Sequence, residues 1–278
     1  MNMRIDSHQH YWSIARGDYG WITPEIPVLY RDYLPVDLAP SLAKHGIDKT
    51  VAVQAAPTLA ETDYLLALSD KDDSIAAVVG WLDLDDPDYW QHFERMRKHP
   101  KLAGFRMMIQ ELPDPNAVLE PHFVKALQRF EEENIPVDLL VVSHQLDTVI
   151  KLLELVPNLR GVIDHIAKPR IAEGVLDPWR DQMAEIAKHK SIYCKLSGMV
   201  TEADHQHWQP EDFSRYIRFV LEHFGPERVM FGSDWPVCLL AASYDEVIGV
   251  LEDSIPFDWS GADRDRLYGL NAKEFYKL

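Results

Sequence analysis

Residues 75–82 read Ile-Ala-Ala-Val-Val-Gly-Trp-Leu, an apolar run that no polar side chain interrupts. A strand with one face in water alternates between apolar and polar residues, whereas a strand of a parallel sheet is covered on both faces and is apolar throughout. The run therefore predicts a buried strand of a parallel sheet.

Seven further segments read as strands and most of them are largely apolar, whereas residues 4–6 give only a brief strand pattern. Helical patterns fill the gaps between them, so strand and helix alternate through almost the whole sequence. Eight such units in 278 residues are typical of a (β/α)8 TIM barrel, which we expect to occupy residues 1–278 as a single domain, with an additional C-terminal helix over residues 263–278. The seven segments are residues 4–6, 49–54, 102–107, 136–142, 159–164, 192–196 and 229–231.

Proline and glycine mark the expected ends of several helices. Asp86-Pro87 and Asp177-Pro178 each place a carboxylate before a proline, which predicts a capping aspartate followed by the first helical turn. Residues 210–224 read as an amphipathic helix that begins at its proline and ends before a glycine. The alternative architecture, a doubly wound open sheet, usually carries a Gly-x-Gly-x-x-Gly motif, and no predicted strand is followed by one.

The charge of the chain excludes some classes of protein. It has 28 Lys and Arg residues against 45 Asp and Glu residues, so its formal net charge is 28 − 45 = −17. Nucleic acids and anionic membrane surfaces both require a basic face, so we expect neither as a partner, whereas a small-molecule partner and a homo-oligomer stay open. No apolar run reaches the about 18 residues of a membrane span. The only cysteines, Cys194 and Cys238, lack metal-site spacing and predict a reducing cytoplasm.

The first predicted strand leads into two histidines. In a barrel of this type the loops that follow the strands build the active site, and residues 6–20 read as such a loop. His8 and His10 stand two apart, so in extended backbone both imidazoles point to the same side and can bind one metal ion. His205 and His207 have the same spacing, but no strand precedes them, which favours a solvated loop.

The sixth and eighth predicted strands also end in reactive side chains. After the sixth come Asp164, His165 and Lys168, a group that core packing does not readily explain. After the eighth comes Asp234, whose carboxylate suits metal ligation or general-base catalysis. A structural histidine and a helix-capping aspartate are the non-catalytic alternatives at His165 and Asp234.

Other polar and aromatic side chains near the strand ends are candidates for substrate binding. Arg106 ends an apolar run, where an unpaired guanidinium would be costly, so a substrate oxygen or a barrel carboxylate must meet it. The same argument applies to Lys195 in the seventh strand. Tryptophan rings stack on the apolar faces of sugars, although ordinary packing explains them equally well. The remaining candidates are Gln54, Lys168, Trp12, Trp21, Trp81 and Trp235.

Together these motifs resemble the amidohydrolase superfamily, and within it the amidohydrolase-2 branch of sugar-acid lactonases. That branch includes L-fuconolactonase-like and L-rhamnonolactonase-like enzymes and the related 2-pyrone-4,6-dicarboxylate lactonases. The resemblance covers nearly the whole chain and is specific in its combination of motifs. They are Ile5-Asp6-Ser7-His8-Gln9-His10, Gly104-Phe105-Arg106, Val162-Ile163-Asp164-His165 with Lys168-Pro169, Lys195-Leu196-Ser197-Gly198 and Gly232-Ser233-Asp234-Trp235-Pro236.

The resemblance implies a barrel that hydrolyses a lactone ring. Asp234 would be the general base that activates water, and His165 would orient water or substrate and is, with Lys168, a candidate proton donor. The cofactor implied is one divalent metal ion, zinc first, held by His8, His10, His165 and Asp234, or no metal at all.

One departure from the superfamily pattern argues against a binuclear centre. Members with two metals usually bridge them with a lysine at the end of the fourth strand, where this chain has Arg106. His144, after the fifth strand, is a minor candidate ligand. Two other functions stay open: a metal-dependent decarboxylase of an aromatic or pyrone acid, which uses a similar histidine and aspartate set, and a non-catalytic ligand-binding barrel.

Overall fold

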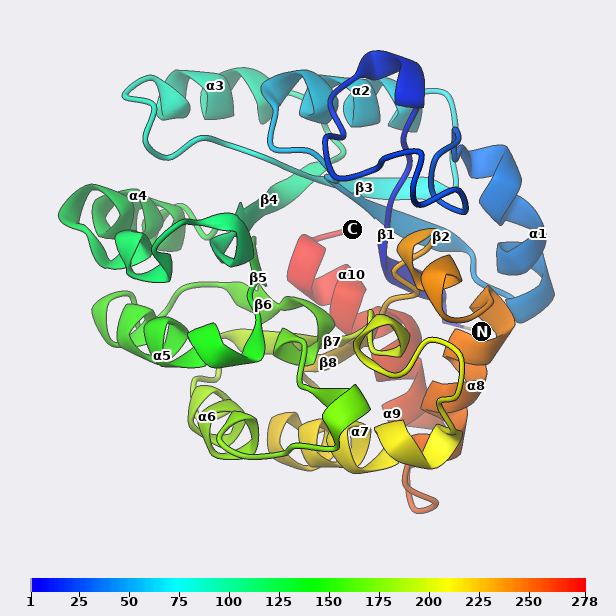
Figure 1. Ribbon diagram of the computed structural model, residues 1–278. Coiled ribbons are helices and arrows are strands. Elements are labelled where there is room, and N and C mark those ends of the chain that lie inside the picture. The colour runs from blue at the N-terminus through cyan, green and yellow to red at the C-terminus, as the bar shows by residue number, and fades with distance from the viewer. Residues whose placement is uncertain (1) are drawn as a thin grey trace.

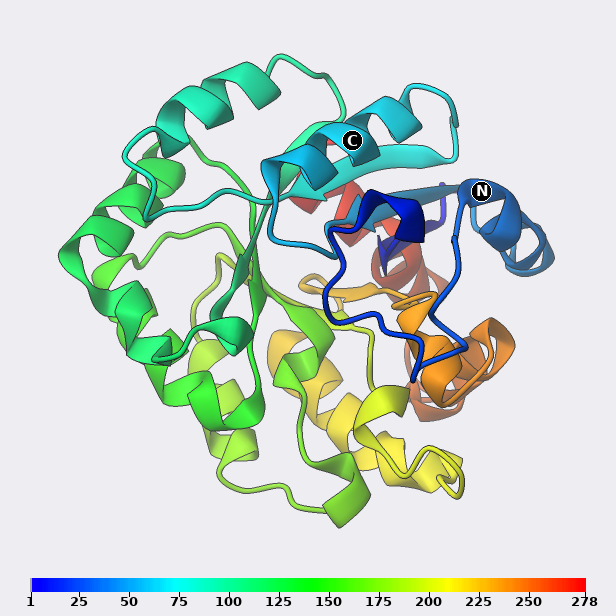
Figure 2. The ribbon, with the colours of Figure 1, turned by 45° about the horizontal axis from the view of Figure 1, so that its top comes forward.

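The computed structural model describes residues 2–278 and confirms the predicted barrel. Eight strands form one parallel sheet in the order β1 to β8, and helices surround it (Figures 1 and 2). The strands are β1 (Ile5–Gln9), β2 (Lys49–Val53), β3 (Ile75–Gly80), β4 (Leu102–Met108), β5 (Val137–Leu140), β6 (Gly161–Ile163), β7 (Ile192–Leu196) and β8 (Val229–Phe231).

A helix follows each strand, and the predicted additional helix follows the last of these. That C-terminal region is α9 (Gly261–Asp265), a π-helical segment (Arg266–Leu270) and α10 (Asn271–Tyr276) in direct succession. The outer helices are α1 (Pro35–His45), α2 (Leu59–Ser69), α3 (Tyr89–Met96), α4 (Pro121–Glu132), α5 (Leu146–Leu155), α6 (Trp179–Ile186), α7 (Pro210–Phe224) and α8 (Tyr244–Ser254).

The barrel closes where β8 meets β1. The backbone N–H of Asp234 donates to the carbonyl of His8 at 2.8 Å, and the N–H of His10 donates to the carbonyl of Trp235 at 2.7 Å. Asp6 supports this seam, because its carboxylate accepts the backbone N–H of Ser233 at 2.9 Å. Closure of the fold therefore brings the first histidine motif against the eighth-strand aspartate.

Side chains along the strands point alternately outward and inward. On β2, Ala52 belongs to the large core between sheet and helices, whereas Val51 and Val53 belong to a smaller cluster inside the barrel. Phe275 and Tyr276 of α10 join this inner cluster, so the C-terminal helix packs across one end of the barrel interior (Figure 1).

The structure corrects several predicted boundaries. Strand β1 continues to Gln9, so residues 7–9 belong to the strand and not to the loop expected there. Helix α3 begins only at Tyr89, because Asp86 accepts the backbone N–H of Asp88 at 2.8 Å and forms a turn before the helix.

The second aspartate–proline pair is corrected in the same way, since α6 begins at Trp179, after Asp177-Pro178. The predicted start of α7 at Pro210 and its end before Gly225 are confirmed. No helix among residues 2–278 is both long enough and apolar enough to cross a membrane.

Candidate active site

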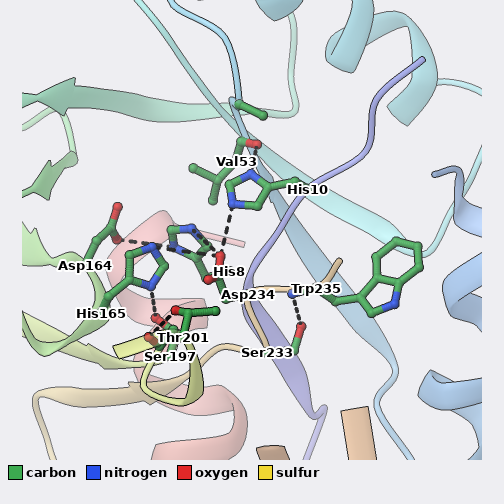
Figure 3. A network of polar contacts seen from close by, with 12 residues as sticks. His8, His10, Val53, Asp164, His165, Ser197, Thr201, Ser233, Asp234 and Trp235 are labelled. Atoms are coloured by element: carbon green, nitrogen blue, oxygen red, sulfur yellow. Dashed lines mark hydrogen bonds and ion pairs between the residues drawn. The ribbon is translucent and has the colours of Figure 1, made fainter. Parts of the chain in front are cut away.

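Three imidazoles converge on one carboxylate at the ends of β1, β6 and β8. The Oδ1 atom of Asp234 lies 3.2 Å from Nε2 of His10, 3.8 Å from Nε2 of His8 and 3.9 Å from Nε2 of His165 (Figure 3). All four side chains are buried. The four residues predicted from the strand ends are therefore brought together in one site.

The opposite nitrogen of each ring is held by the barrel. Nδ1 of His10 lies 2.8 Å from the carbonyl oxygen of Val53, and Nδ1 of His165 lies 2.9 Å from the hydroxyl of Ser197 (Figure 3). Nδ1 of His8 lies 3.1 Å from Nζ of Lys195. Each ring is thus anchored on one side and presents Nε2 to the centre, as metal-ligating histidines do.

The contacts of His10 determine which of its ring nitrogens faces Asp234, and this arrangement requires positive charge at the centre of the site. The Val53 carbonyl can only accept, so Nδ1 of His10 carries the ring proton, and a neutral ring directs a bare Nε2 at the Asp234 oxygen 3.2 Å away. Two lone pairs at this distance repel unless a proton or a cation lies between them. Nε2 of His8 is buried beside them and has no hydrogen-bond partner among residues 2–278.

This donor set fits a metal ion. One ligand atom from each of His8, His10 and Asp234 lies within 4.8 Å of the others, and His8 forms a second such group with Asp164 and His165. Imidazole nitrogens and a carboxylate oxygen are the ligands that zinc takes in catalytic sites. An unpartnered buried nitrogen and a facing pair of lone pairs are what a cation would satisfy.

Burial sets the protonation of these groups. Loss of hydration lowers the pKa of His8 well below its usual value, and the charge of Lys195 lowers it further. Burial also lowers the pKa of His165, against the opposing charge of Asp234. Burial by itself would raise the pKa of Asp234, but its interactions with the surrounding imidazoles and with Lys168 outweigh burial and hold that pKa below its usual value.

The loops that carry these residues adopt unusual backbone conformations. His165 has φ = 54°, and the next three residues and Asp234 are also left-handed. Non-glycine residues rarely adopt this region, and they persist there where surrounding structure fixes them, often at functional sites. Close approach explains Gly232, because a Cβ there would lie 2.6 Å from Cβ of His8.

A cavity of about 200 Å³ opens directly beside the cluster. Arg106 and Lys168, both predicted as substrate-binding residues, line it, and so does Trp21. The remaining lining combines polar residues with an apolar wall. These residues are His10, Ala55, Met108, Gln110, Glu111, Leu140, His165, Asp234 and Val237.

Gln54, a candidate for substrate binding, does not line this cavity and contacts Arg106 instead. Its side-chain oxygen accepts from Nε of Arg106 at 3.2 Å and from a terminal nitrogen of the same guanidinium at 2.7 Å. The side chain is fully buried and orients Arg106 from behind. Asp164, 3.8 Å from Arg106, is the barrel carboxylate that the buried guanidinium required.

The structure places three of the candidate tryptophans outside the lining of this cavity. Trp12 is completely buried, and its indole N–H donates to the Arg31 carbonyl at 2.8 Å. Trp235 is also buried and packs edge-on against Tyr33, pointing away from the imidazoles (Figure 3). Trp81 lines a neighbouring apolar cavity of about 160 Å³, not the one beside Asp234. The rings of Trp12 and Trp235 are therefore buried by packing between loops.

Lys195 is likewise not at the cavity. It is completely buried on the inner face of β7, between Asp138 at 2.5 Å and Asp164 at 3.1 Å. Two carboxylates therefore meet this charge, which is the second of the two alternatives that the sequence left open for Lys195.

The remaining histidine candidates lie apart from the cluster. His144 is exposed in a short 3-10 turn after β5, and His205 and His207 are exposed in the loop before α7. None of the three is part of a metal-binding group found among residues 2–278. The context of the preceding strand therefore separates His8 and His10 from the identically spaced pair.

Sequence reasoning missed several residues that support the site. Asp138, Ser197 and Val53 contact Lys195, His165 and His10, and of these three only Ser197 stands in one of the motifs quoted above. Glu61, Gln110 and Tyr276 were also missed. No sequence signal distinguishes them from their neighbours, since Glu61, for example, stands beside Thr62 and Asp63.

Glu61 fixes the loop after β2. Its carboxylate accepts the backbone N–H of Ala55 at 2.9 Å and that of Ala56 at 2.7 Å, and burial raises its pKa to about 7. The Ala55 carbonyl in turn accepts the indole N–H of Trp21 at 2.8 Å. This chain of contacts holds Trp21 at the cavity.

An eight-stranded barrel with three imidazoles and a carboxylate at the ends of its strands has the fold and site of an amidohydrolase-type enzyme. The chain belongs to the amidohydrolase family, whose family model matches residues 5–278. An L-fucono-1,5-lactonase of Burkholderia ambifaria is 37% identical over 100% of this chain and 97% of its own length.

Two further relatives are similarly close. An L-fucono-1,5-lactonase of Burkholderia multivorans is 39% identical over 99% of this chain and 96% of its own length. A crystal structure of an amidohydrolase from Burkholderia multivorans with bound zinc superposes with a TM-score of 0.94, at 40% identity and 99% coverage of both chains.

The buried imidazoles give a prediction for pH titration. Because burial lowers the pKa of His8 and His165, both rings should stay neutral as the pH falls through about 6.5, the ordinary midpoint of histidine. The measurement is the ¹⁵N spectrum of the histidine rings in the metal-free protein, with each signal assigned by the loss it suffers in a single substitution. A midpoint near the ordinary value for either ring would contradict the account.

Proposed function

We propose that this protein hydrolyses the ring ester of a sugar-acid lactone and releases the open-chain acid. The observation that carries the proposal is the ionised carboxylate of Asp234, held among three imidazoles at the wall of a cavity. The two relatives named L-fucono-1,5-lactonase match this chain from end to end and support the same reaction. L-fucono-1,5-lactone is therefore the first substrate to test.

The cavity has the chemistry that a polyhydroxylated ring requires. The side-chain oxygen of Gln110 is buried with no hydrogen-bond partner among residues 2–278, so it can accept from a substrate hydroxyl. Trp21 offers an aromatic ring to an apolar sugar face. Arg106 and Lys168 place two cations beside the cavity, where a carboxylate product would carry its negative charge.

Asp234 is the proposed general base. Hydrolysis of a lactone requires a base for the water, positive charge for the oxyanion and a proton donor for the departing ring oxygen. Asp234 takes a proton from water, whose oxygen bonds to the carbonyl carbon and forms a tetrahedral intermediate. When that intermediate collapses, the ring C–O bond breaks, and the ring oxygen receives the proton that Asp234 took from water, passed directly or by way of His165 or Lys168.

Arg106 supplies positive charge without moving. Gln54 and Asp164 fix its guanidinium before substrate binds, so no reorganisation is needed when the oxyanion forms.

We assign the metal pocket to His8, His10, His165 and Asp234, with zinc as the first metal to test. The zinc-bound structure of the Burkholderia multivorans relative supports this assignment, as do the bare Nε2 atoms of His8 and His10. A metal bound there would supply positive charge to the oxyanion and favour the deprotonated form of water. The chain's own contribution is to orient the rings through Lys195, Val53 and Ser197.

The reaction itself gives the first functional prediction. In weak buffer the protein should release acid from L-fucono-1,5-lactone and related aldonolactones, and Asp234→Asn should lower kcat by about 10²-fold or more, because a general base is lost. Asp204→Asn is the matched control, since Asp204 is exposed in the loop before α7. The measurement is proton release, corrected for the spontaneous hydrolysis of each lactone.

The outcomes of that experiment separate the alternatives. Absence of acid release from every lactone, with carbon dioxide release from an aromatic or pyrone acid, would favour the decarboxylase. Binding of a lactone without turnover would favour a non-catalytic barrel. Full turnover by Asp234→Asn would mean that another residue acts as the base.

The metal assignment gives the second functional prediction. The purified protein should bind about one zinc ion per chain, and His8→Asn or His10→Asn should weaken binding strongly, because each removes a ligand nitrogen. His207→Asn should bind as the unaltered protein does, since His207 is exposed and apart from the cluster. Zinc content and competition with a chelator measure this. Equal binding by all of these proteins would refute the assigned ligands.

A further inference from the structure

The C-terminal helix α10 contributes one polar side chain to the interior of the barrel. Tyr276 is only 3% exposed, and its ring belongs to the inner apolar cluster. Its hydroxyl lies 2.8 Å from Oδ1 and 3.0 Å from Oδ2 of Asp138, on the inner face of β5. A carboxylate can only accept, so the Tyr276 hydroxyl is the donor.

Asp138 connects this hydroxyl to the buried cation. Its Oδ2 atom lies 2.5 Å from Nζ of Lys195, which is completely buried. Nζ of Lys195 lies at the same time 3.1 Å from Oδ1 of Asp164 and 3.1 Å from Nδ1 of His8. A continuous series of contacts therefore runs from the last helix to a ring of the metal pocket.

Each link in this series constrains the next. A buried carboxylate is costly unless its oxygens are satisfied, and the Tyr276 hydroxyl satisfies the side of Asp138 that Lys195 does not. The ammonium is enclosed by the carboxylates of Asp138 and Asp164, which neutralise its charge, and by His8, whose Nδ1 also lies 3.3 Å from Oδ1 of Asp164. Moving Asp138 would therefore draw Lys195 away from His8.

We propose that Tyr276 is a positioning residue of the active site, whose hydroxyl fixes Asp138 and, through Lys195, sets the orientation of the His8 ring. The C-terminal helix thereby acts on the metal pocket from the opposite end of the barrel. The turnover and Co²⁺-affinity parts of its test rest on the proposed function, whereas the orientation of His8 can be measured without substrate or metal.

Removal of the hydroxyl tests the proposal. In Tyr276→Phe the ring keeps its packing, but Asp138 loses a donor, so Lys195 should shift and the His8 ring with it. We expect a displaced His8 ring ¹⁵N signal in the metal-free protein, and affinity for Co²⁺ weakened by roughly 10-fold to 100-fold, the usual effect of losing an outer partner of a ligand. We expect kcat to fall while KM changes little, because Tyr276 does not line the substrate cavity.

A matched variant distinguishes positioning from a general loss of stability. Tyr268→Phe removes a buried hydroxyl from the same C-terminal region without touching Asp138, and it should leave the His8 signal and Co²⁺ affinity unchanged. Circular dichroism and thermal unfolding establish that each variant is folded.

The proposal is overturned if folded Tyr276→Phe retains the His8 signal of the unaltered protein, or if Tyr268→Phe shifts it equally. If Tyr276→Phe does not fold, Asp138→Asn tests the same link, because it removes the charge that holds Lys195, and an unmoved His8 signal there is equally decisive. If the unaltered protein hydrolyses no lactone or binds no metal, the proposed function fails separately, and the His8 signal still decides this inference.

Discussion

A lysine ammonium enclosed in the barrel interior is the constraint on which the site depends. Lys195 has no access to water, and its charge is met by Asp138 at 2.5 Å and Asp164 at 3.1 Å. Removing one partner of such a buried pair typically costs about 3–5 kcal/mol, because an uncompensated charge remains. Its neighbours are therefore tightly specified, and they include His8, a proposed metal ligand, and, through Asp164, the guanidinium of Arg106. The buried charges of Lys195 and its two carboxylate partners therefore hold His8 and Arg106 in place before substrate binds.

Closure of the sheet between β8 and β1 brings the remaining groups of the site together. Two backbone hydrogen bonds between β1 and the end of β8 bring His8 and His10 against Asp234, which stands more than 220 positions later in the chain. The carbonyl of Val53 then determines which nitrogen of His10 faces the carboxylate. The lone pairs of Nε2 of His10 and Oδ1 of Asp234 then face each other, which is unfavourable in the protein alone and favourable once a cation is bound. The fold therefore favours a metal ion at this position. This is how a scaffold shared by many activities acquires one particular chemistry.

The barrel and the centre of its site could be predicted from the sequence for a physical reason. Strands covered on both faces are continuously apolar, and the carboxyl ends of parallel strands meet at one edge, so His8, His165 and Asp234 had to lie close together. The supporting residues could not be predicted in this way, because Asp138 and Tyr276 are paired across the barrel interior by three-dimensional packing and belong to no local motif. Exposure of an aromatic ring is similarly a property of the folded loop: Trp21 remains at the cavity, whereas Trp12 is buried by its neighbours. The predicted starts of α3 and α6 were wrong because an aspartate before a proline can also form an ordinary turn outside a helix.

Isotope labelling of the solvent tests the central claim most directly. If water activated by Asp234 attacks the carbonyl carbon of the lactone, hydrolysis in H₂¹⁸O places one ¹⁸O atom in the carboxylate of the product and leaves the former ring oxygen unlabelled. The ¹³C signal of the carboxylate and the mass of its fragments report the position of the label, with enzyme-free lactone measured in parallel to correct for spontaneous hydrolysis. Label in the carboxylate, at a rate that depends on the enzyme, is the result that this account predicts. Label in the released hydroxyl group, or no enzyme-dependent incorporation, would contradict it.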